Sequence, residues 1–218
     1  MSAINFSISD AISLAWNKFK ENIPTWVGTS ILVLALGSIA GDKTILFYGG
    51  MDITYPSNAG IIFGVIIAYL ELGIIKMAIN HIRGEAIDFK DLYSVSLNTF
   101  LNYIVAYIIT SFFIIIGLIL LIIPGIHLAL RFMFVQYLIV DKDISFNVAI
   151  KESMRMTKGN TINLFLLVLT FGLIAIAGII CLFVGLIVAC PVIWLAGAYI
   201  YTVFEQKTNQ INEPQVVS

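Results

Sequence analysis

The sequence predicts an all-α, polytopic membrane protein with six transmembrane helices arranged as three hairpins, each preceded by a short cytoplasmic amphipathic helix. Of the 218 residues, 60% are hydrophobic and only 11% are charged. Soluble domains carry about 25% charged residues, so this composition cannot cover a surface that faces water. Long uncharged stretches, such as residues 159–204, have room for two helices of the roughly 20 residues that a bilayer requires.

Six apolar segments give the predicted crossings. The first two are separated by residues 41–59, which contain charges, Pro56 and two adjacent glycines and therefore predict a loop. The third and fourth form one long apolar run that is divided at Pro124 and Gly125, and the fifth and sixth are divided near residues 185–191. In chain order, the predicted crossings are residues 24–40, 60–80, 101–123, 126–140, 161–182 and 192–204.

Positive charge is distributed unequally between the two sides of the predicted bundle. All but two of the 12 Lys and Arg residues fall in the N-terminal segment, in or beside the loops after the second and fourth crossings, or in the C-terminal tail. The exceptions are Lys43, in a loop on the other side, and Arg131, inside the fourth crossing. Because short loops rich in Lys and Arg stay in the cytoplasm, we expect a multi-pass membrane protein with both termini cytoplasmic.

A pattern of apolar residues recurs before the first, third and fifth crossings. Starting from Ile8, Phe89 and Phe146, the residues at i, i+3, i+4, i+7, i+8 and i+11 are mostly apolar and mark one face of a helix. Such a helix lies at the membrane surface with its apolar face in the headgroup region; the alternative is the cytoplasmic end of a long crossing helix. We expect one membrane domain at residues 1–206, with repeat units at about 4–82, 87–142 and 144–206, and a disordered polar tail at 207–218.

Two charged residues, Glu71 and Arg131, lie inside predicted crossings. Each precedes the end of its crossing by nine residues, so at about 1.5 Å per residue both are expected near mid-bilayer. A lone charge there is costly, and equal depth with opposite sign predicts a buried ion pair. Such a pair either fixes helix register or lines a ligand site. The remaining alternative is an unpaired Arg131 whose long side chain extends toward the membrane surface. His127, one turn before Arg131, completes the predicted polar cluster.

Pro124, Gly125 and Pro191 are the predicted helix breaks. A proline in a helix interior removes a backbone hydrogen bond, and a following glycine favours a turn. We expect Pro124 and Gly125 to turn the chain between the third and fourth crossings, and Pro191 to do so between the fifth and sixth. The alternative is a broken helix whose free carbonyl groups bind an ion.

The sequence has no motif typical of an enzyme, a metal site or a nucleic-acid-binding protein. It contains no nucleophile elbow, no metalloprotease helix and no phosphate-binding loop. Its two histidines and two cysteines lack the spacing of a zinc site, and its basic residues are mixed with acidic ones. We therefore expect no enzymatic activity, no metal or cofactor and no nucleic-acid partner.

A series of motif residues extends from the second to the third repeat unit. It consists of Arg83-Gly84-Glu85, Ile123-Pro124-Gly125-Ile126, Arg131-Phe132, Tyr137, Asp141, Ala149-Ile150, Ser153 and Lys158-Gly159-Asn160. The series resembles a bacterial integral-membrane family, the domain-of-unknown-function family 975, and the related membrane domain found beside glycerophosphodiester phosphodiesterases. The resemblance covers roughly residues 82–171 and implies a helical protein of the bacterial cytoplasmic membrane without an assigned activity. We expect no phosphodiesterase catalysis, because no such catalytic domain accompanies the series in this sequence.

Two functions remain open from the sequence. The first is a non-enzymatic structural or regulatory scaffold that interacts with membrane lipids, with a membrane-protein partner or with a second copy of itself. The alternative is a transporter or channel for a small or lipid-like solute, with Glu71 and Arg131 as its polar centre. The small number of polar residues in the predicted crossings favours the scaffold, because a hydrophilic path requires more of them.

Overall fold

Helices make up most of the structure. The computed structural model describes Ile4 and residues 6–40, 43–48, 51–56, 58–181 and 184–212. In chain order, this part of the protein forms α1 (Ile8–Glu21), α2 (Ile23–Ala40), β1 (Lys43–Tyr48), β2 (Met51–Pro56), α3 (Asn58–Ile82), the 3-10 helix η1 (Phe89–Tyr93), α4 (Leu97–Leu120), α5 (Ile122–Arg131), α6 (Val135–Lys142), α7 (Phe146–Met156), α8 (Thr161–Ile180) and α9 (Val184–Asn212).

Five helical segments of the described chain are long and apolar enough to cross a membrane. They lie in α3, α4, α5–α6, α8 and α9, and α2 contains a shorter apolar helix, Ile23–Ser38. Large hydrophobic side chains are exposed along α4 and α8; Ile119 and Ile162, for example, are each 77% exposed. Extended apolar surfaces of this kind belong in lipid. The structure is therefore that of a helical, multi-pass membrane protein.

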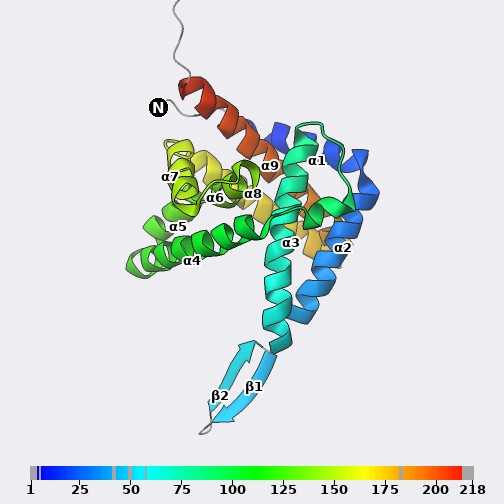
Figure 1. Cartoon of the computed structure of the whole chain (residues 1–218), viewed down its shortest axis with the longest axis vertical. Helices are drawn as coiled ribbons and strands as arrows, with labels where there is room; N and C mark the ends of the chain where they lie inside the picture. Colours follow the sequence, from blue (N-terminus) through cyan, green and yellow to red (C-terminus); the bar gives the residue numbers. More distant parts are fainter. Residues whose placement is uncertain are drawn as a thin grey trace, which may run out of the picture.

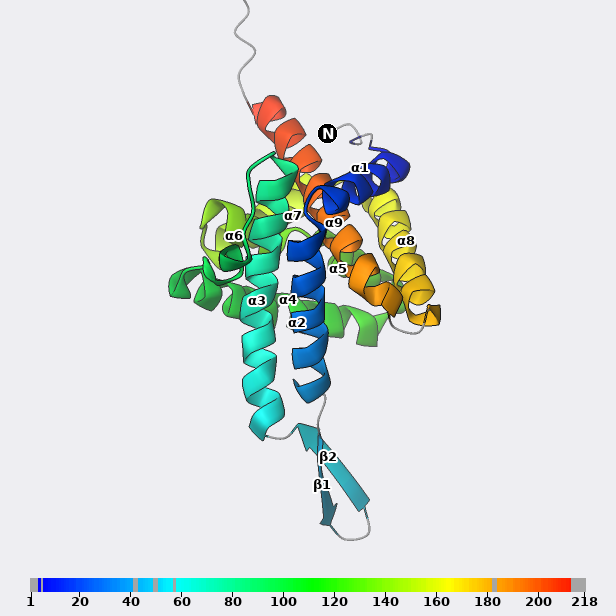
Figure 2. The ribbon, with the colours of Figure 1, turned by 90° about the vertical axis from the view of Figure 1, so that its right-hand side faces the viewer.

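The helical hairpins are not parallel to one another. α2 and α3 run side by side and lead at one end into the β1–β2 hairpin (Figure 1). α1 and the C-terminal part of α9 lie at the opposite end of the molecule, as Figure 2 also shows. In both views α4 runs crosswise to α2 and α3, and α5 packs back against α4. The second helical hairpin therefore has a different direction from the first.

The loop expected at residues 41–59 instead contains a two-stranded antiparallel sheet. β1 pairs with β2 from Lys43 opposite Pro56 to Tyr48 opposite Met51. Both strands contain isoleucine, threonine and tyrosine, which favour extended backbone. The two adjacent glycines expected in the loop fall at positions 49–50, outside the described residues.

The predicted surface helices α1 and α7 bury their apolar faces in protein. α1 packs against α9, and its Ala11, Ala15 and Phe19 side chains are buried. α7 packs against α6, and its Ala149 and Ser153 are fully buried. The expectation that these faces lie in the headgroup region is therefore wrong for the buried residues, because neighbouring helices cover them.

The second predicted amphipathic segment is not a single helix. η1 ends at Tyr93, and α4 begins only at Leu97. Between them, the Ser96 hydroxyl accepts a hydrogen bond from the backbone N–H of Thr99 at 3.1 Å. A serine that caps the first turn in this way marks the start of a helix. The apolar stripe that begins at Phe89 is therefore divided between two elements.

The α4–α5 and α8–α9 hairpins close on pairs of glycines. A Cβ atom added to Gly117 would lie 2.9 Å from the Cα atom of Gly125, and one added to Gly185 would lie 2.8 Å from the Cα atom of Gly178. Only glycine allows two helix backbones to approach so closely. These contacts determine where each hairpin turns.

The predicted helix breaks are displaced from the observed turns. α4 ends at Leu120, so Pro124 lies in the first turn of α5, where a missing N–H is tolerated, and Gly125 packs against α4. Pro191 lies inside α9, which begins at Val184. The prediction that Pro191 separates two crossings is therefore wrong, because the glycine contact closes that hairpin earlier in the chain.

α9 also extends beyond the predicted end of the membrane domain. The helix continues to Asn212 and so includes the first residues of the tail that was expected to be disordered. Thr208 is only 3% exposed, so packing against the rest of the protein continues to this point and stabilises the extra turns. Residues 213–218 lie outside the described part of the chain.

Candidate functional site

An ion-pair network joins the ends of α3, α6 and α9. Arg83 follows the last residue of α3, and its guanidinium donates to both carboxylate oxygens of Asp141 in α6, at 2.5 and 2.8 Å. The same guanidinium donates to Glu205 in α9 at 2.8 Å, and Lys142 lies 3.1 Å from the other carboxylate oxygen of Glu205. Two basic and two acidic side chains from distant parts of the sequence thus neutralise one another.

Partial burial distinguishes this network from a surface ion pair. The side chain of Asp141 is 8% exposed and that of Glu205 is 15% exposed, whereas that of Arg83 is 37% exposed. The hydrogen bonds to Asp141, followed by those to Glu205, raise the pKa of Arg83 above its ordinary value. Bidentate pairing fixes direction as well as distance. It therefore holds α6 against the end of α3.

An aromatic cluster attaches the network to the protein core. The hydroxyl of Tyr201 donates to Asp141 at 2.8 Å. The Tyr201 ring stacks on that of Tyr137 with centroids 5.3 Å apart, and Phe134 contacts both rings. Tyr201 and Phe134 are fully buried. Because a polar network is stronger in such surroundings than in water, these contacts contribute more than exposed pairs would.

A second polar cluster joins α1, α2 and α3. The indole N–H of Trp26 donates to Nδ1 of His81 at 3.0 Å, and Nε2 of His81 lies 3.3 Å from the Glu21 carboxylate. Glu21 also pairs with Lys18 at 2.8 Å, and this hydrogen bond, more than the one to His81, lowers the pKa of Glu21. Trp26 is fully buried, so its N–H group needs the acceptor that His81 provides.

The structure does not pair Glu71 with Arg131. Within the described chain, neither side chain forms a hydrogen bond or an ion pair with the other. The Glu71 side chain is instead exposed on α3. The predicted ion pair is therefore wrong. The two side chains do not meet because their helices pack against different neighbours: α3 contacts α6 and α9, whereas α5 contacts α4 and α8.

Arg131 lies at a break in the predicted fourth crossing. α5 ends at this residue, and α6 begins at Val135. The guanidinium of Arg131 donates to the carbonyl oxygen of Met154 in α7 at 2.6 Å. The hydroxyl of Ser153, also in α7, donates to the carbonyl oxygen of Arg131 at 2.8 Å and accepts from the N–H of Phe134 at 3.2 Å.

The contacts of Ser153 satisfy backbone groups that the helix break leaves without helical partners. Such groups are costly in a membrane unless another part of the protein binds them. This explains why a serine interrupts the apolar stripe of α7. α7 also carries Lys151 and Arg155, which require contact with water or an ion partner. Arg131 therefore contacts α7, a helix that carries charged side chains.

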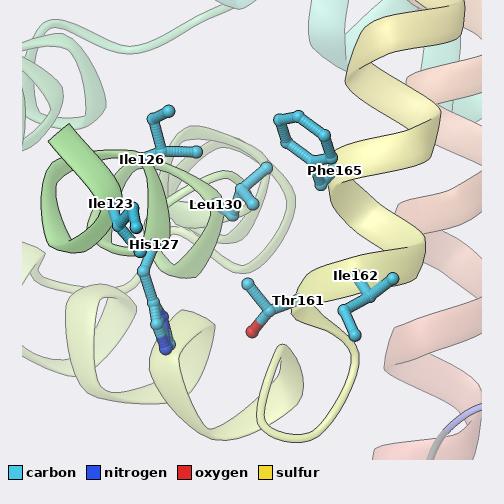
Figure 3. Close-up of a pocket in the computed structure, with 7 residues that line it drawn as sticks. All are labelled: Ile123, Ile126, His127, Leu130, Thr161, Ile162 and Phe165. Carbon is cyan, nitrogen blue, oxygen red and sulfur yellow. The ribbon is translucent and has the colours of Figure 1, made fainter.

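His127 borders two adjoining apolar clefts. The first, of about 410 Å³, lies between α5 and α8, where Ile126, Leu130, Ile162 and Phe165 form its apolar walls and Thr161 lies beside His127 (Figure 3). The second, of about 500 Å³, is lined by Pro124, Leu128, Met154 and Arg131 together with His127 and Ile123. Of the predicted polar cluster, His127 and Arg131 thus line a shared cleft, and Glu71 lies elsewhere.

The pairing of Arg83 with Asp141 and Glu205 is not predicted by the sequence. The sequence does single out two of these residues, because Arg83 and Asp141 both belong to the residue series that carries the family resemblance. Glu205 lies 122 residues after Arg83 and carries no such signal. In the described chain, no group of three or more His, Cys, Asp or Glu side chains is placed to hold a metal ion.

The fold and these contacts define a class of protein, a helical membrane protein whose charged side chains join the ends of its helices. Comparison with models of known families, with curated proteins and with solved structures finds no match to this chain.

Proposed function

We propose that this chain is a non-enzymatic scaffold of the bacterial cytoplasmic membrane that interacts with lipid or with a membrane partner. One observation carries the proposal: Arg83 pairs with Asp141 and Glu205 at the same time. The charges at three helix ends are thereby used to hold the helices in one arrangement. A scaffold requires such a fixed arrangement, and breaking a pair of this kind is strongly destabilising.

In this proposal the apolar segments cross the membrane as three hairpins, with both termini in the cytoplasm. The distribution of Lys and Arg supports this orientation. The positions of α1 and the C-terminal part of α9, at one end of the molecule, agree with it. Transmembrane helices tilt by up to about 40°, so in this proposal the crosswise α4–α5 hairpin crosses the membrane at a steep tilt. The side of the membrane on which the hairpin tip, near Leu121, lies tests this part of the topology.

Membership of family 975 belongs to the same proposal. Three residues of the motif series make contacts between helices: Arg83 and Asp141 with each other, and Ser153 with the break between α5 and α6. A shared set of architectural contacts would explain why these residue types occur together at these positions. The resemblance therefore supports a structural role and adds no activity.

Solute flux in reconstituted vesicles separates the scaffold from the alternative, a transporter or channel. We expect vesicles that contain the protein to take up small neutral and charged solutes no faster than vesicles without protein. The same assay on Glu71→Gln and Arg131→Gln shows whether either side chain contributes to a path. A flux that disappears with either substitution would overturn the scaffold and support the alternative.

A further inference from the structure

Arg131 carries a positive charge that the contacts within the protein do not neutralise. Within the described residues it forms no ion pair, and its Nε atom has no hydrogen-bond partner. Its guanidinium donates to Met154, but this acceptor is a neutral backbone carbonyl. A cation beside apolar surface is costly when it lacks a counter-ion. An anion next to Arg131 would therefore stabilise it.

The two clefts beside Arg131 are apolar along most of their walls and polar at one end. Figure 3 shows the imidazole of His127 and the hydroxyl of Thr161 toward the same end of the α5–α8 cleft, where α8 begins. Phe165 lies further along α8 and belongs to the apolar part. The second cleft adjoins the first at His127 and contains Arg131. The two clefts thus share Ile123 and His127, and the second cleft adds the guanidinium of Arg131.

The start of α8 adds to the positive potential at this polar end. Asn160 occupies the N-cap position but makes no side-chain hydrogen bond to the first turn, because its side-chain oxygen accepts from the backbone N–H of Ile4 at 2.8 Å. The first N–H groups of a helix and its dipole favour an anion. Thr161, the first residue of α8, lies beside His127 in the cleft. The start of α8 therefore favours an anion in the α5–α8 cleft, which His127 also lines.

We propose that the two clefts hold the acyl chains of an anionic phospholipid, with its phosphate beside Arg131, His127 and the start of α8. This proposal rests on the proposed membrane role and names the lipid that the scaffold engages. Charge complementarity selects this occupant: a guanidinium binds phosphate in a defined geometry, and the apolar walls match hydrocarbon. An apolar partner helix would cover the clefts and leave the charge of Arg131 unmatched. The position of α7 assigns the lipid to the cytoplasmic leaflet.

A tryptophan placed in the cleft reports which lipid occupies it. The full chain with Phe165→Trp is reconstituted in phosphatidylcholine vesicles. One set of vesicles contains a small fraction of dibrominated phosphatidylglycerol, and the other contains the same fraction of dibrominated phosphatidylcholine. Quenching of tryptophan fluorescence is measured relative to the parent chain with its three native tryptophans. Leu173→Trp, two turns further along α8 and 60% exposed, is the matched control. One basic residue near an anionic surface contributes about a fivefold preference. We therefore expect about fivefold preference for phosphatidylglycerol at position 165 and none at position 173.

Charge variants in the Phe165→Trp chain test the two side chains. Arg131→Met should abolish the preference and Arg131→Lys should retain most of it, whereas Lys151→Met, which removes an exposed charge on α7, should leave it unchanged. His127 is exposed, so His127→Ala provides a second variant that leaves the folded core intact, and it should reduce the preference. Equal quenching by the two lipids at position 165 would overturn the proposal, as would a preference that survives both Arg131→Met and His127→Ala.

The control position also separates this proposal from the one on which it rests. Quenching of Leu173→Trp by both lipids places α8 in the bilayer whatever happens at position 165. If both positions are quenched equally by both lipids, the lipid site is wrong and the membrane role stands. If neither position is quenched by either lipid, the membrane role itself is wrong.

Discussion

Arg83 precedes Asp141 by 58 residues, yet its guanidinium binds both oxygens of that carboxylate and also reaches Glu205. This contact brings together α3, α6 and α9, which contribute many of the largest fully buried side chains, including Met77, Leu138 and Phe204. The other long helices, α4 and α8, expose much of their apolar surface. The protein thus has an inner set of helices whose ends are joined by charge and an outer set that faces lipid.

Removal of Arg83 should destabilise the protein. Arg83→Gln leaves Asp141 and Glu205 without their shared cation, and hydrogen bonds to charged groups contribute about 1.5–3 kcal/mol. Since Arg83 is partly exposed, we expect a loss of about 2 kcal/mol in unfolding free energy, measured by denaturation in detergent. Arg155→Gln is the comparison, because the ion pair of Arg155 with Glu152 lies within one turn of α7, is partly exposed and should contribute less than about 1 kcal/mol. Equal losses in the two variants would contradict the role of the network.

Ser153→Ala tests the helix break. The substitution removes the hydroxyl that binds the Arg131 carbonyl and the Phe134 N–H. The Phe134 N–H then lacks a partner, and the Arg131 carbonyl keeps only the longer contact with the Thr157 hydroxyl, at 3.4 Å. We expect a loss of about 1–3 kcal/mol in unfolding free energy. Ser145→Ala provides the comparison, since Ser145 is exposed and makes no side-chain cap hydrogen bond. If Ser153→Ala is as mild as this control, the hydroxyl does not hold α5 and α6 together.

The glycine contacts predict a position-dependent effect of adding one methyl group. Gly185→Ala places a Cβ atom 2.7 Å from the carbonyl oxygen of Gly178 and should cost about 1–3 kcal/mol of stability. Gly172→Ala, in the same hairpin, meets no atom within 4 Å and should be neutral or stabilise by up to about 1 kcal/mol. Thermal melting of both variants in one detergent compares them directly. Similar melting temperatures would show that the hairpin does not close on this contact.

Glu71 and Arg131 should act independently. They share no hydrogen-bond or ion-pair partner in the described chain. The losses of stability in Glu71→Gln and Arg131→Gln should therefore add in the double variant to within about 0.5 kcal/mol. The buried ion pair expected from the sequence would instead make the double variant milder than the sum of the single variants. A coupling energy well above about 0.5 kcal/mol would show that the two side chains do form an ion pair.

The sequence predicts the apolar segments well and their arrangement poorly. α2, α3, α4 and α8 lie within a few residues of their predicted positions because hydrophobic length is a local property. The direction of the α4–α5 hairpin and the burial of α1 against α9 depend on contacts between distant segments. No periodicity within one segment contains that information.

For the candidate site, too, the sequence predicts local features but not the contacts between distant segments. The sequence identifies Arg131 and His127 because a charge and a histidine in an apolar run are locally unusual. It misplaces the partner of Arg131, because depth along two helices does not determine which of their faces meet. It also treats Pro191 as a break, although the turn is set by Gly178 and Gly185, whose contact appears only when the two helices pack.

Labelling of Cys181 tests the membrane topology most directly. Its thiol is free and exposed at the α8–α9 turn, whereas Cys190 is half-buried in α9. A membrane-impermeant maleimide added to intact spheroplasts should label the native chain from outside, and Cys181→Ser should remove the label. Labelling of Cys181 that appears only after the membrane is permeabilised would place this turn in the cytoplasm and contradict the three-hairpin orientation.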